Sequence, residues 1–187
     1  RIFYTRCNHY YREEIMQLNY LNKPHFENGA IKSISQVLEE HGIKNPLICT
    51  DPGLANIGMS DMIRNLLSNE LSPSFYEDTP ANPTEQAVND ALEIYKQNGC
   101  DGVVGFGGGS SMDLAKTVAL MANHEGNVVD YSVNEGGVGK INQTMPMIAI
   151  PTTSGTGSEV SLGAVIIMND GRKLIPVSYT HLRAHET

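Results

Sequence analysis

Apolar residues along this chain follow two different spacings, which replace each other several times between residues 30 and 168. In 30–41 they recur every three or four positions, as on the buried face of a helix, and Gly42 is suited to the end of that helix. In 46–50 they form a short continuous run that is followed by Asp-Pro-Gly, which is typical of a buried strand with a sharp turn after it. The pattern therefore predicts a helix and then a buried strand.

The same two spacings alternate through the rest of the chain, and Thr84 and Gly99 are suited to begin and end the central helix. The predicted helices cover 54–69, 84–98 and 110–123, and the predicted strands cover 74–77, 101–106, 147–150 and 164–168. A stretch rich in Gly and Asn, 126–142, is predicted to be a loop. Strands that alternate with helices indicate βαβ units. We therefore expect an α/β fold with a Rossmann-like, mostly parallel sheet and flanking helices.

Composition and charge limit the classes of function. The chain has 187 residues, of which 40% are hydrophobic and 18% charged, as in a single globular domain. A net charge of -8 without a Lys/Arg cluster argues against binding to nucleic acid. Because no long apolar run and no signal peptide is evident, we expect no membrane contact and a cytoplasmic location. Cys7, Cys49 and Cys100 lack metal-ligand spacing, which favours a reducing compartment and buried or incidental thiols.

A glycine-rich segment, 106–113, lies between a predicted strand and a predicted helix. Glycines let a ligand approach the backbone closely, and the start of a helix offers free N–H groups and the positive end of the helix dipole. Together with the Ser110 hydroxyl, these features suit a pyrophosphate. The alternative is a plain tight turn in which Ser110 caps the helix and Asp113 stands at capping-box spacing. The segment does not fit Gly-x-Gly-x-x-Gly, the P-loop or Gly-x-Ser-x-Gly.

Three other places carry candidate chemistry. Segment 152–159, which follows a predicted strand, offers hydroxyl and backbone donors at the sheet edge where α/β proteins bind ligands, although polar loops also have this composition. Asp51 follows the first predicted strand, where a carboxylate accepts hydrogen bonds from ribose and disfavours a 2′-phosphate; an ordinary Asp-Pro-Gly turn is the alternative. His181 and His185 have helical spacing for a metal, but no third ligand is evident.

Taken together, the glycine-rich segment 107–113 and the threonine-rich segment 151–160 resemble the two signature segments of the iron-containing (group III) alcohol dehydrogenases, within the dehydroquinate synthase-like superfamily. Asn82-Pro-Thr-Glu85 resembles a third signature and Gly29-Ala30 a fourth, in matching order and spacing. The resemblance runs from about Phe26 to about Lys173. It implies an N-terminal α/β domain that binds NAD(P) and a C-terminal helical domain that binds a divalent metal.

The resemblance also implies roles for individual residues of the N-terminal domain. Asp51 would hold the adenosine ribose, and Asn82 would lie beside the cofactor. The other implied cofactor-binding residues are Gly108, Gly109 and Ser110 at the pyrophosphate, Asp113 ordering that loop, Thr152, Thr153 and Thr156 along the adenine and nicotinamide side, and Val165 and Lys173 nearby. The implied reaction is reversible hydride transfer between a small alcohol or aldehyde and NAD, with iron or zinc as a Lewis acid.

The family's metal ligands, an Asp and three His, have no counterpart in this sequence. We therefore expect no catalytic and no metal-binding residue here, and a C-terminal helical domain that is absent from the chain. The predicted parts are an N-terminal arm over 1–22, an NAD-binding domain over 23–176 and a tail over 177–187 that does not match the family and is hypothesised to be foreign or misread. We expect the chain alone to bind NAD weakly, if at all, and not to oxidise alcohol. A homo-oligomer, a non-catalytic nucleotide-binding module and a metal-free reductase similar to maleylacetate reductase remain open.

Overall fold

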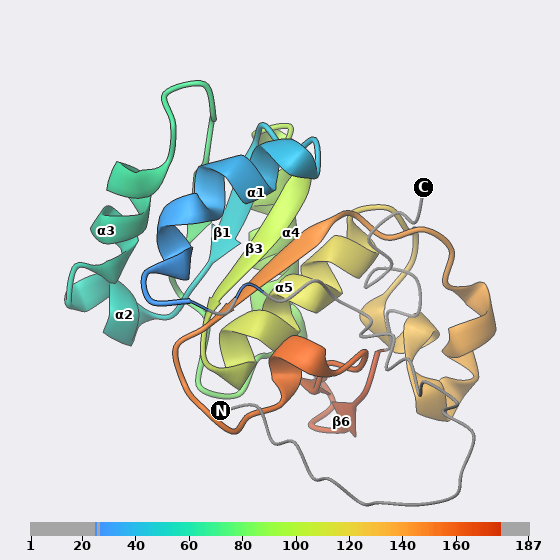
Figure 1. The fold of residues 1–187 in the computed structure, drawn as a ribbon. Coiled ribbons are helices and arrows are strands. Elements are labelled where there is room, and N and C mark those ends of the chain that lie inside the picture. Colours follow the sequence, from blue (N-terminus) through green and yellow to red (C-terminus); the bar gives the residue numbers. More distant parts are fainter. Residues whose placement is uncertain (1–24, 26, 177–187) are drawn as a thin grey trace, which may run out of the picture.

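The computed structural model describes residues 25 and 27–176, and its centre is a four-stranded parallel sheet (Figure 1). The order of the strands is β2-β1-β3-β4, and each neighbouring pair is parallel. The strands are β1 (Pro46–Cys49), β2 (Ser74–Tyr76), β3 (Gly102–Gly107) and β4 (Met147–Pro151). The predicted α/β fold with a parallel sheet is confirmed.

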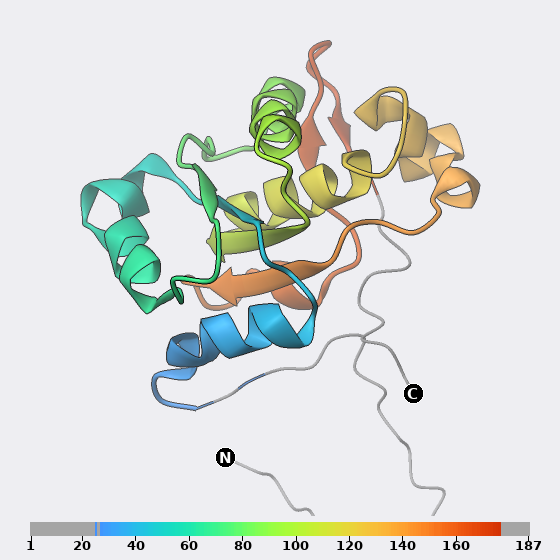
Figure 2. The same cartoon turned by 90° about the horizontal axis from the view of Figure 1, so that it is seen from above.

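Helices cover both faces of this sheet (Figure 2). The short helix η1 (Ala30–Ser33) leads into α1 (Ile34–Glu40), and α1 lies on one face with α3 (Met59–Leu66). The longer helices α4 (Glu85–Gln97) and α5 (Gly109–Met121) lie on the other face. Alternate residues of the strands point to opposite faces, so Ile48 packs towards α1 while Leu47 packs towards α4 and α5. The continuous apolar runs of the sequence therefore correspond to strands that are buried on both sides.

One predicted helix is interrupted in the structure, and the central one is present as predicted. The helix expected over 54–69 is divided into α2 (Pro52–Asn56) and α3. Gly58 separates them, because its φ of 81° lies in the left-handed region and cannot continue a helix. The central helix agrees better with the prediction, since the Thr84 hydroxyl accepts a hydrogen bond from the amide of Ala87 and caps α4.

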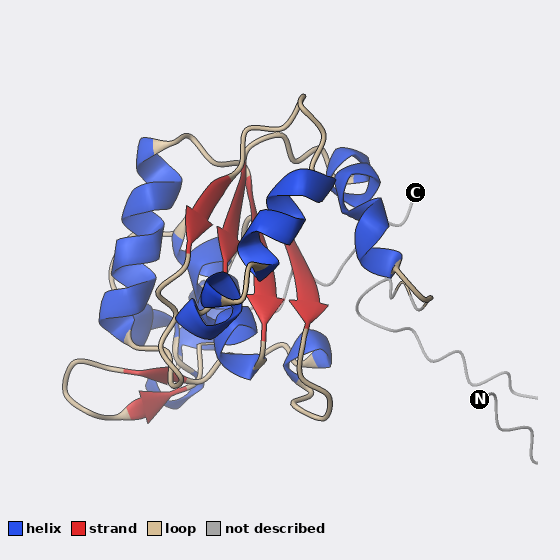
Figure 3. Ribbon diagram, turned by 90° about the vertical axis from the view of Figure 1, so that its left-hand side faces the viewer, coloured by secondary structure: helices blue, strands red, loops and turns tan. Residues whose placement is uncertain are grey.

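The last predicted strand does not join the parallel sheet. Within 164–168 only Ile166–Ile167 forms a strand, β5, which pairs antiparallel with β6 (Lys173–Leu174) in a small separate sheet (Figure 3). The pattern missed β6, because two residues are too short for a periodicity. The amide of Ile167 donates to the carbonyl of Pro83 at 2.9 Å, so this small sheet is held against the start of α4.

The loop expected over 126–142 contains three short 3₁₀ helices, and a fourth follows the threonine-rich segment. They are η2 (Val128–Tyr131), η3 (Val133–Glu135), η4 (Gly137–Lys140) and η5 (Ser158–Val160). In the described part of the chain, no helix has the length and apolar character needed to cross a membrane. The predicted arm, the predicted tail and Cys7 lie outside the described residues, whereas Cys49 and Cys100 are buried as expected.

Candidate functional site

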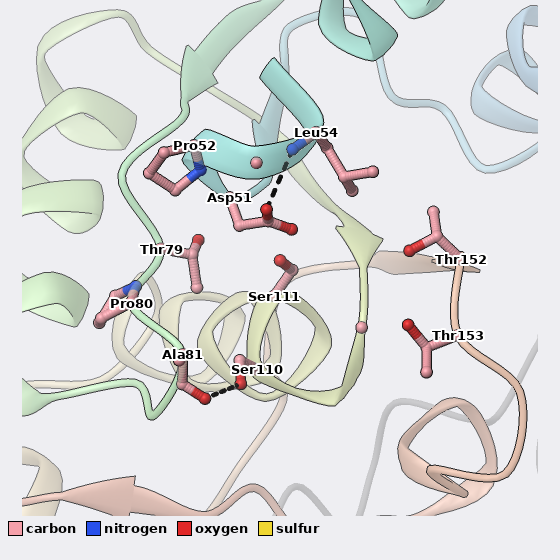
Figure 4. A pocket seen from close by; sticks show the side chains of 12 residues that line it. Asp51, Pro52, Leu54, Thr79, Pro80, Ala81, Ser110, Ser111, Thr152 and Thr153 are labelled. Carbon is pink, nitrogen blue, oxygen red and sulfur yellow. Dashed lines mark hydrogen bonds between the residues drawn. The ribbon is translucent and has the colours of Figure 1, made fainter. Parts of the chain in front are cut away.

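A cavity of about 520 Å³ lies where the carboxyl ends of the four parallel strands meet (Figure 4). Its lining residues are 51–54, 79–81, 108, 110–111 and 152–153, which follow β1, β2, β3 and β4 respectively. The chain leaves β1 to form β2 on one side and later forms β3 on the other side. The crevice between β1 and β3 is thus the topological switch point, which is where open α/β sheets bind their ligands.

The two carboxylate oxygens of Asp51 have different surroundings: one contacts the start of a helix and the other faces the cavity. Its Oδ1 accepts a hydrogen bond of 3.1 Å from the amide of Leu54 and caps α2. Its Oδ2 has no hydrogen-bond partner within residues 25 and 27–176 and lies 3.3 Å from the position that a Cβ on Gly107 would take. One oxygen therefore stabilises the start of α2, while the other is available at the switch point.

The glycine run brings the backbone of α5 to the cavity without side chains. At Gly107 φ is 152°, and a Cβ there would lie 2.5 Å from Oγ of Ser111. A Cβ on Gly108 would lie 3.4 Å from Oγ1 of Thr153, and one on Gly109 would lie 3.6 Å from Cβ of Thr156. Larger residues would therefore fill the space between α5 and the threonine-rich segment. The first N–H groups of α5 have no partner inside the helix and create a positive end, which is a suitable place for an anion.

Ser110 does not cap α5, contrary to one of the two interpretations of the sequence. The N-cap is Gly108, in an extended conformation and without a side-chain hydrogen bond. The Ser110 hydroxyl instead donates to the carbonyl of Ala81 at 2.5 Å, which ties the start of α5 to the loop after β2 (Figure 4). Asp113 makes no capping-box contact with Ser110 either.

Asp113 instead joins α5 to the segment after the threonine-rich loop. Its Oδ1 accepts a hydrogen bond of 2.5 Å from the hydroxyl of Ser158, and its Oδ2 accepts one of 2.9 Å from the amide of Val165. The ammonium of Lys116 lies 3.3 Å from Asp113 and also donates to Oγ of Ser158 at 3.0 Å and to the carbonyl of Gly163 at 2.9 Å. Burial lowers the pKa of Lys116, and the nearby charge of Asp113 acts in the opposite direction.

The structure brings together five of the predicted cofactor-binding residues around the cavity, namely Asp51, Gly108, Ser110, Thr152 and Thr153. Gly109 and Thr156 face each other next to it, although the Thr156 hydroxyl donates to Glu159 at 3.2 Å. The other four do not line it: Asp113 bonds to Ser158 and Val165, Asn82 is exposed in the loop before α4, Val165 is 44% exposed, and Lys173 lies in β6.

Seven of the twelve lining residues were not predicted to bind a cofactor, and two of these seven, Thr79 and Ser111, carry hydroxyl groups. Each has a side chain that is 1% exposed, and neither hydroxyl has a hydrogen-bond partner in the part of the chain that the structure describes. The available signal was positional, because Thr79 follows a strand at the same edge as Asp51 and Ser111 follows the glycine run. Among the described residues, no three His, Cys, Asp or Glu side chains are grouped so that they could hold a metal ion. The residues present thus do not form the metal site that the resemblance implies.

Comparison with protein families agrees with this geometry. The family model described as iron-containing alcohol dehydrogenase matches residues 22–185. The chain belongs to this family. The match includes both signature segments and also most of the tail that we expected to lie outside it, so the boundary at 176 stays a prediction.

Individual relatives of this chain are named as dehydrogenases and reductases. The 4-hydroxybutyrate dehydrogenase of Cupriavidus necator is 45% identical over 156 residues, which are 83% of this chain and 41% of that protein. The NAD-dependent methanol dehydrogenase of Bacillus methanolicus is 34% identical over 151 residues, or 80% of this chain and 39% of that protein. A solved structure of sulfoacetaldehyde reductase from Bifidobacterium kashiwanohense in complex with NAD+ matches with a TM-score of 0.73 and 30% sequence identity. The match covers 82% of this chain and 40% of the reductase chain. The family is thus one of oxidoreductases, and the chain spans about two fifths of the length of these relatives.

Proposed function

We propose that this chain is the nucleotide-binding part of an NAD-dependent alcohol dehydrogenase, and that the cavity binds the ADP-ribose portion of NAD. The observation that carries the proposal is the free N-terminus of α5 opposite the Oδ2 atom of Asp51 across the switch point. The structure of the related sulfoacetaldehyde reductase in complex with NAD+ supports NAD as the ligand. The substrate would be a small alcohol or aldehyde, as the names of the relatives suggest.

The lining residues would contact the nucleotide from two opposite walls of the cavity. The amides of Gly109 and Ser110, in the first turn of α5, would donate to the diphosphate, while Gly108 leaves room for it. Oδ2 of Asp51 would accept from a ribose hydroxyl and would repel the 2′-phosphate of NADP. Thr152 and Thr153 would form the opposite wall, and Asp113 would keep that wall in place through Ser158.

Bound NAD would supply the nicotinamide ring that accepts hydride from the alcohol carbon. The described residues at the cavity would bind and orient the nucleotide. The groups that activate the alcohol would lie outside the described residues.

The test is a ligand titration of the 187-residue chain, followed by the backbone amides of residues 108–111 in NMR spectra. ADP-ribose and NAD are expected to shift these amides, with NADP binding more weakly. Asp51→Asn keeps an oxygen that can cap α2 but removes the charge, so it should narrow the preference for NAD over NADP by about fivefold or more. Asp61→Asn, at an exposed position on α3, is the matched control and should change neither affinity. An absence of shifts at 108–111 with either ligand, at millimolar concentration, would contradict the proposal.

A further inference from the structure

Two buried hydroxyl groups of residues that line the cavity have no hydrogen-bond partner among the described residues. They belong to Thr79, after β2, and Ser111, in the first turn of α5, and both residues line the cavity. A buried hydroxyl without a hydrogen bond costs roughly 1–3 kcal/mol of stability. Because both residues line the cavity, a bound ligand can supply the missing partners.

The two residues lie close to Asp51. A Cβ added to Gly107 would lie 2.5 Å from Oγ of Ser111 and 3.3 Å from Oδ2 of Asp51. These two oxygen atoms are therefore close to the same point in space. The amide of Thr79 donates to the carbonyl of Thr50 at 3.1 Å, which fixes Thr79 next to the residue that precedes Asp51. Figure 4 shows the side chains of Thr79 and Ser111 on the same side of the cavity as the Asp51 carboxylate.

The chemistry of this group matches a vicinal diol. A carboxylate can only accept hydrogen bonds, so Asp51 satisfies one hydroxyl hydrogen but no oxygen lone pair of a ligand. Serine and threonine hydroxyls both donate and accept. A ribose carries two adjacent hydroxyls that need acceptors for two hydrogens and donors for their oxygens.

We infer that Thr79 and Ser111 act with Oδ2 of Asp51 to recognise the 2′,3′-diol of the ribose, so that the cavity requires a ribonucleotide with both hydroxyls free. This inference rests on the proposed function and assigns to it two residues that were not among the predicted cofactor-binding residues. Ribose would then be recognised by residues that follow three strands, Asp51 after β1, Thr79 after β2 and Ser111 after β3, and not by Asp51 alone.

The experiment compares 5′-AMP, 2′-deoxy-AMP and 3′-deoxy-AMP as ligands of the 187-residue chain and of the variants Ser111→Ala and Thr79→Val. The unmodified chain should prefer 5′-AMP to both deoxy ligands. Each variant should weaken binding of 5′-AMP by about threefold to tenfold, the effect of one net hydrogen bond, and should lose much of the preference against one deoxy ligand. Both variants should melt at the same temperature as the unmodified chain or higher, because they remove an unsatisfied hydroxyl.

The matched control is Ser60→Ala. Ser60 lies on α3, is 3% exposed, and also has an unpartnered hydroxyl, but it does not line the cavity. It should leave all three affinities unchanged, with the same or a higher melting temperature. Unchanged affinities for 5′-AMP in both cavity variants, or unfolding of these variants but not of Ser60→Ala, would overturn the inference while leaving the proposed function intact. Failure of the unmodified chain to bind ADP-ribose and 5′-AMP would instead refute the proposed function itself.

Discussion

The hydroxyl of Ser158 donates a hydrogen bond of 2.5 Å to Oδ1 of Asp113, although 45 positions separate the two residues in the sequence. This contact connects the first turns of α5 with the segment that follows the threonine-rich loop. Lys116 reinforces it by bonding to Asp113, Ser158 and Gly163 at the same time. The two walls of the cavity are therefore held at a fixed separation by a polar cluster that itself lies outside the cavity.

Replacement of Lys116 by Met should loosen this cluster. The side chain of Lys116 is only 10% exposed, and its removal leaves the Asp113 carboxylate without its positive partner. We expect a loss of about 2–4 kcal/mol in the free energy of unfolding, measured with urea, together with faster hydrogen exchange of the amides in 158–165. Lys96→Met, at an exposed position on α4, should change the stability by less than about 0.5 kcal/mol. Equal stability of the two variants would show that the cluster contributes nothing.

Gly107→Ala should destabilise the protein more than Gly42→Ala. Both glycines have a positive φ, but an added Cβ on Gly42 meets nothing within 4 Å, whereas one on Gly107 lies 2.5 Å from Oγ of Ser111. Backbone strain alone should cost about 1–2 kcal/mol at Gly42, and the additional clash should raise the loss at Gly107 to about 3 kcal/mol or more. Urea unfolding of both variants measures the difference, and equal losses would mean that α5 moves to accommodate the methyl group.

Stability should fall in alkaline solution in part because of Tyr76. Burial, with smaller contributions from Asp90 and Asp78, raises the pKa of Tyr76 from 10.0 to about 12. The folded protein therefore keeps this proton where the unfolded chain releases it. The resulting stabilisation is complete below pH 10 and is lost as the pH rises towards 12. Tyr76→Phe should thus show a shallower fall in the free energy of unfolding between pH 10 and 12. Identical slopes would mean that the Tyr76 phenol titrates alike in both states.

Asp101→Ala should lower stability without changing the binding of ligands. The Asp101 carboxylate accepts hydrogen bonds from the amide of Asn45 at 2.8 Å and from the amide of Lys44 at 3.0 Å. These contacts join the amino ends of β1 and β3, at the opposite end of the sheet from the cavity. We expect a loss of about 1–2 kcal/mol in urea unfolding, smaller for Asp101→Asn, and an unchanged affinity for ADP-ribose. A weaker affinity in Asp101→Ala would indicate that strain at one end of the sheet reaches the other.

The sequence was sufficient to predict the fold where local chemistry and burial agree. The apolar runs at β1 and β3 are long enough to reveal strands buried on both faces, and Thr84 marks the start of α4 with the hydrogen bond expected of a cap. The helix expected over 54–69 was wrong because one residue, Gly58, interrupts a pattern that is otherwise helical on both sides.

The candidate site was predictable at Asp51 and the glycine run because strand ends and helix starts are local features. The partner of Ser110 was not predictable, since Ala81 approaches it only after β2 and α5 have packed on the same sheet. Thr79 and Ser111 were missed for the same reason, because their lack of partners depends on the arrangement of three strand ends. Whether the predicted residues bind NAD stays a prediction that the titrations decide.

None of the twelve residues that line the cavity, all within the described part of the chain, is a lysine or an arginine. A phosphorylated ligand would therefore be held by amide dipoles, whose attraction acts over a few ångströms and involves no mobile counterions. The net charge of -8 adds repulsion at longer range. Added salt should consequently leave the affinity nearly constant or improve it slightly, the reverse of what is seen with sites built from basic side chains.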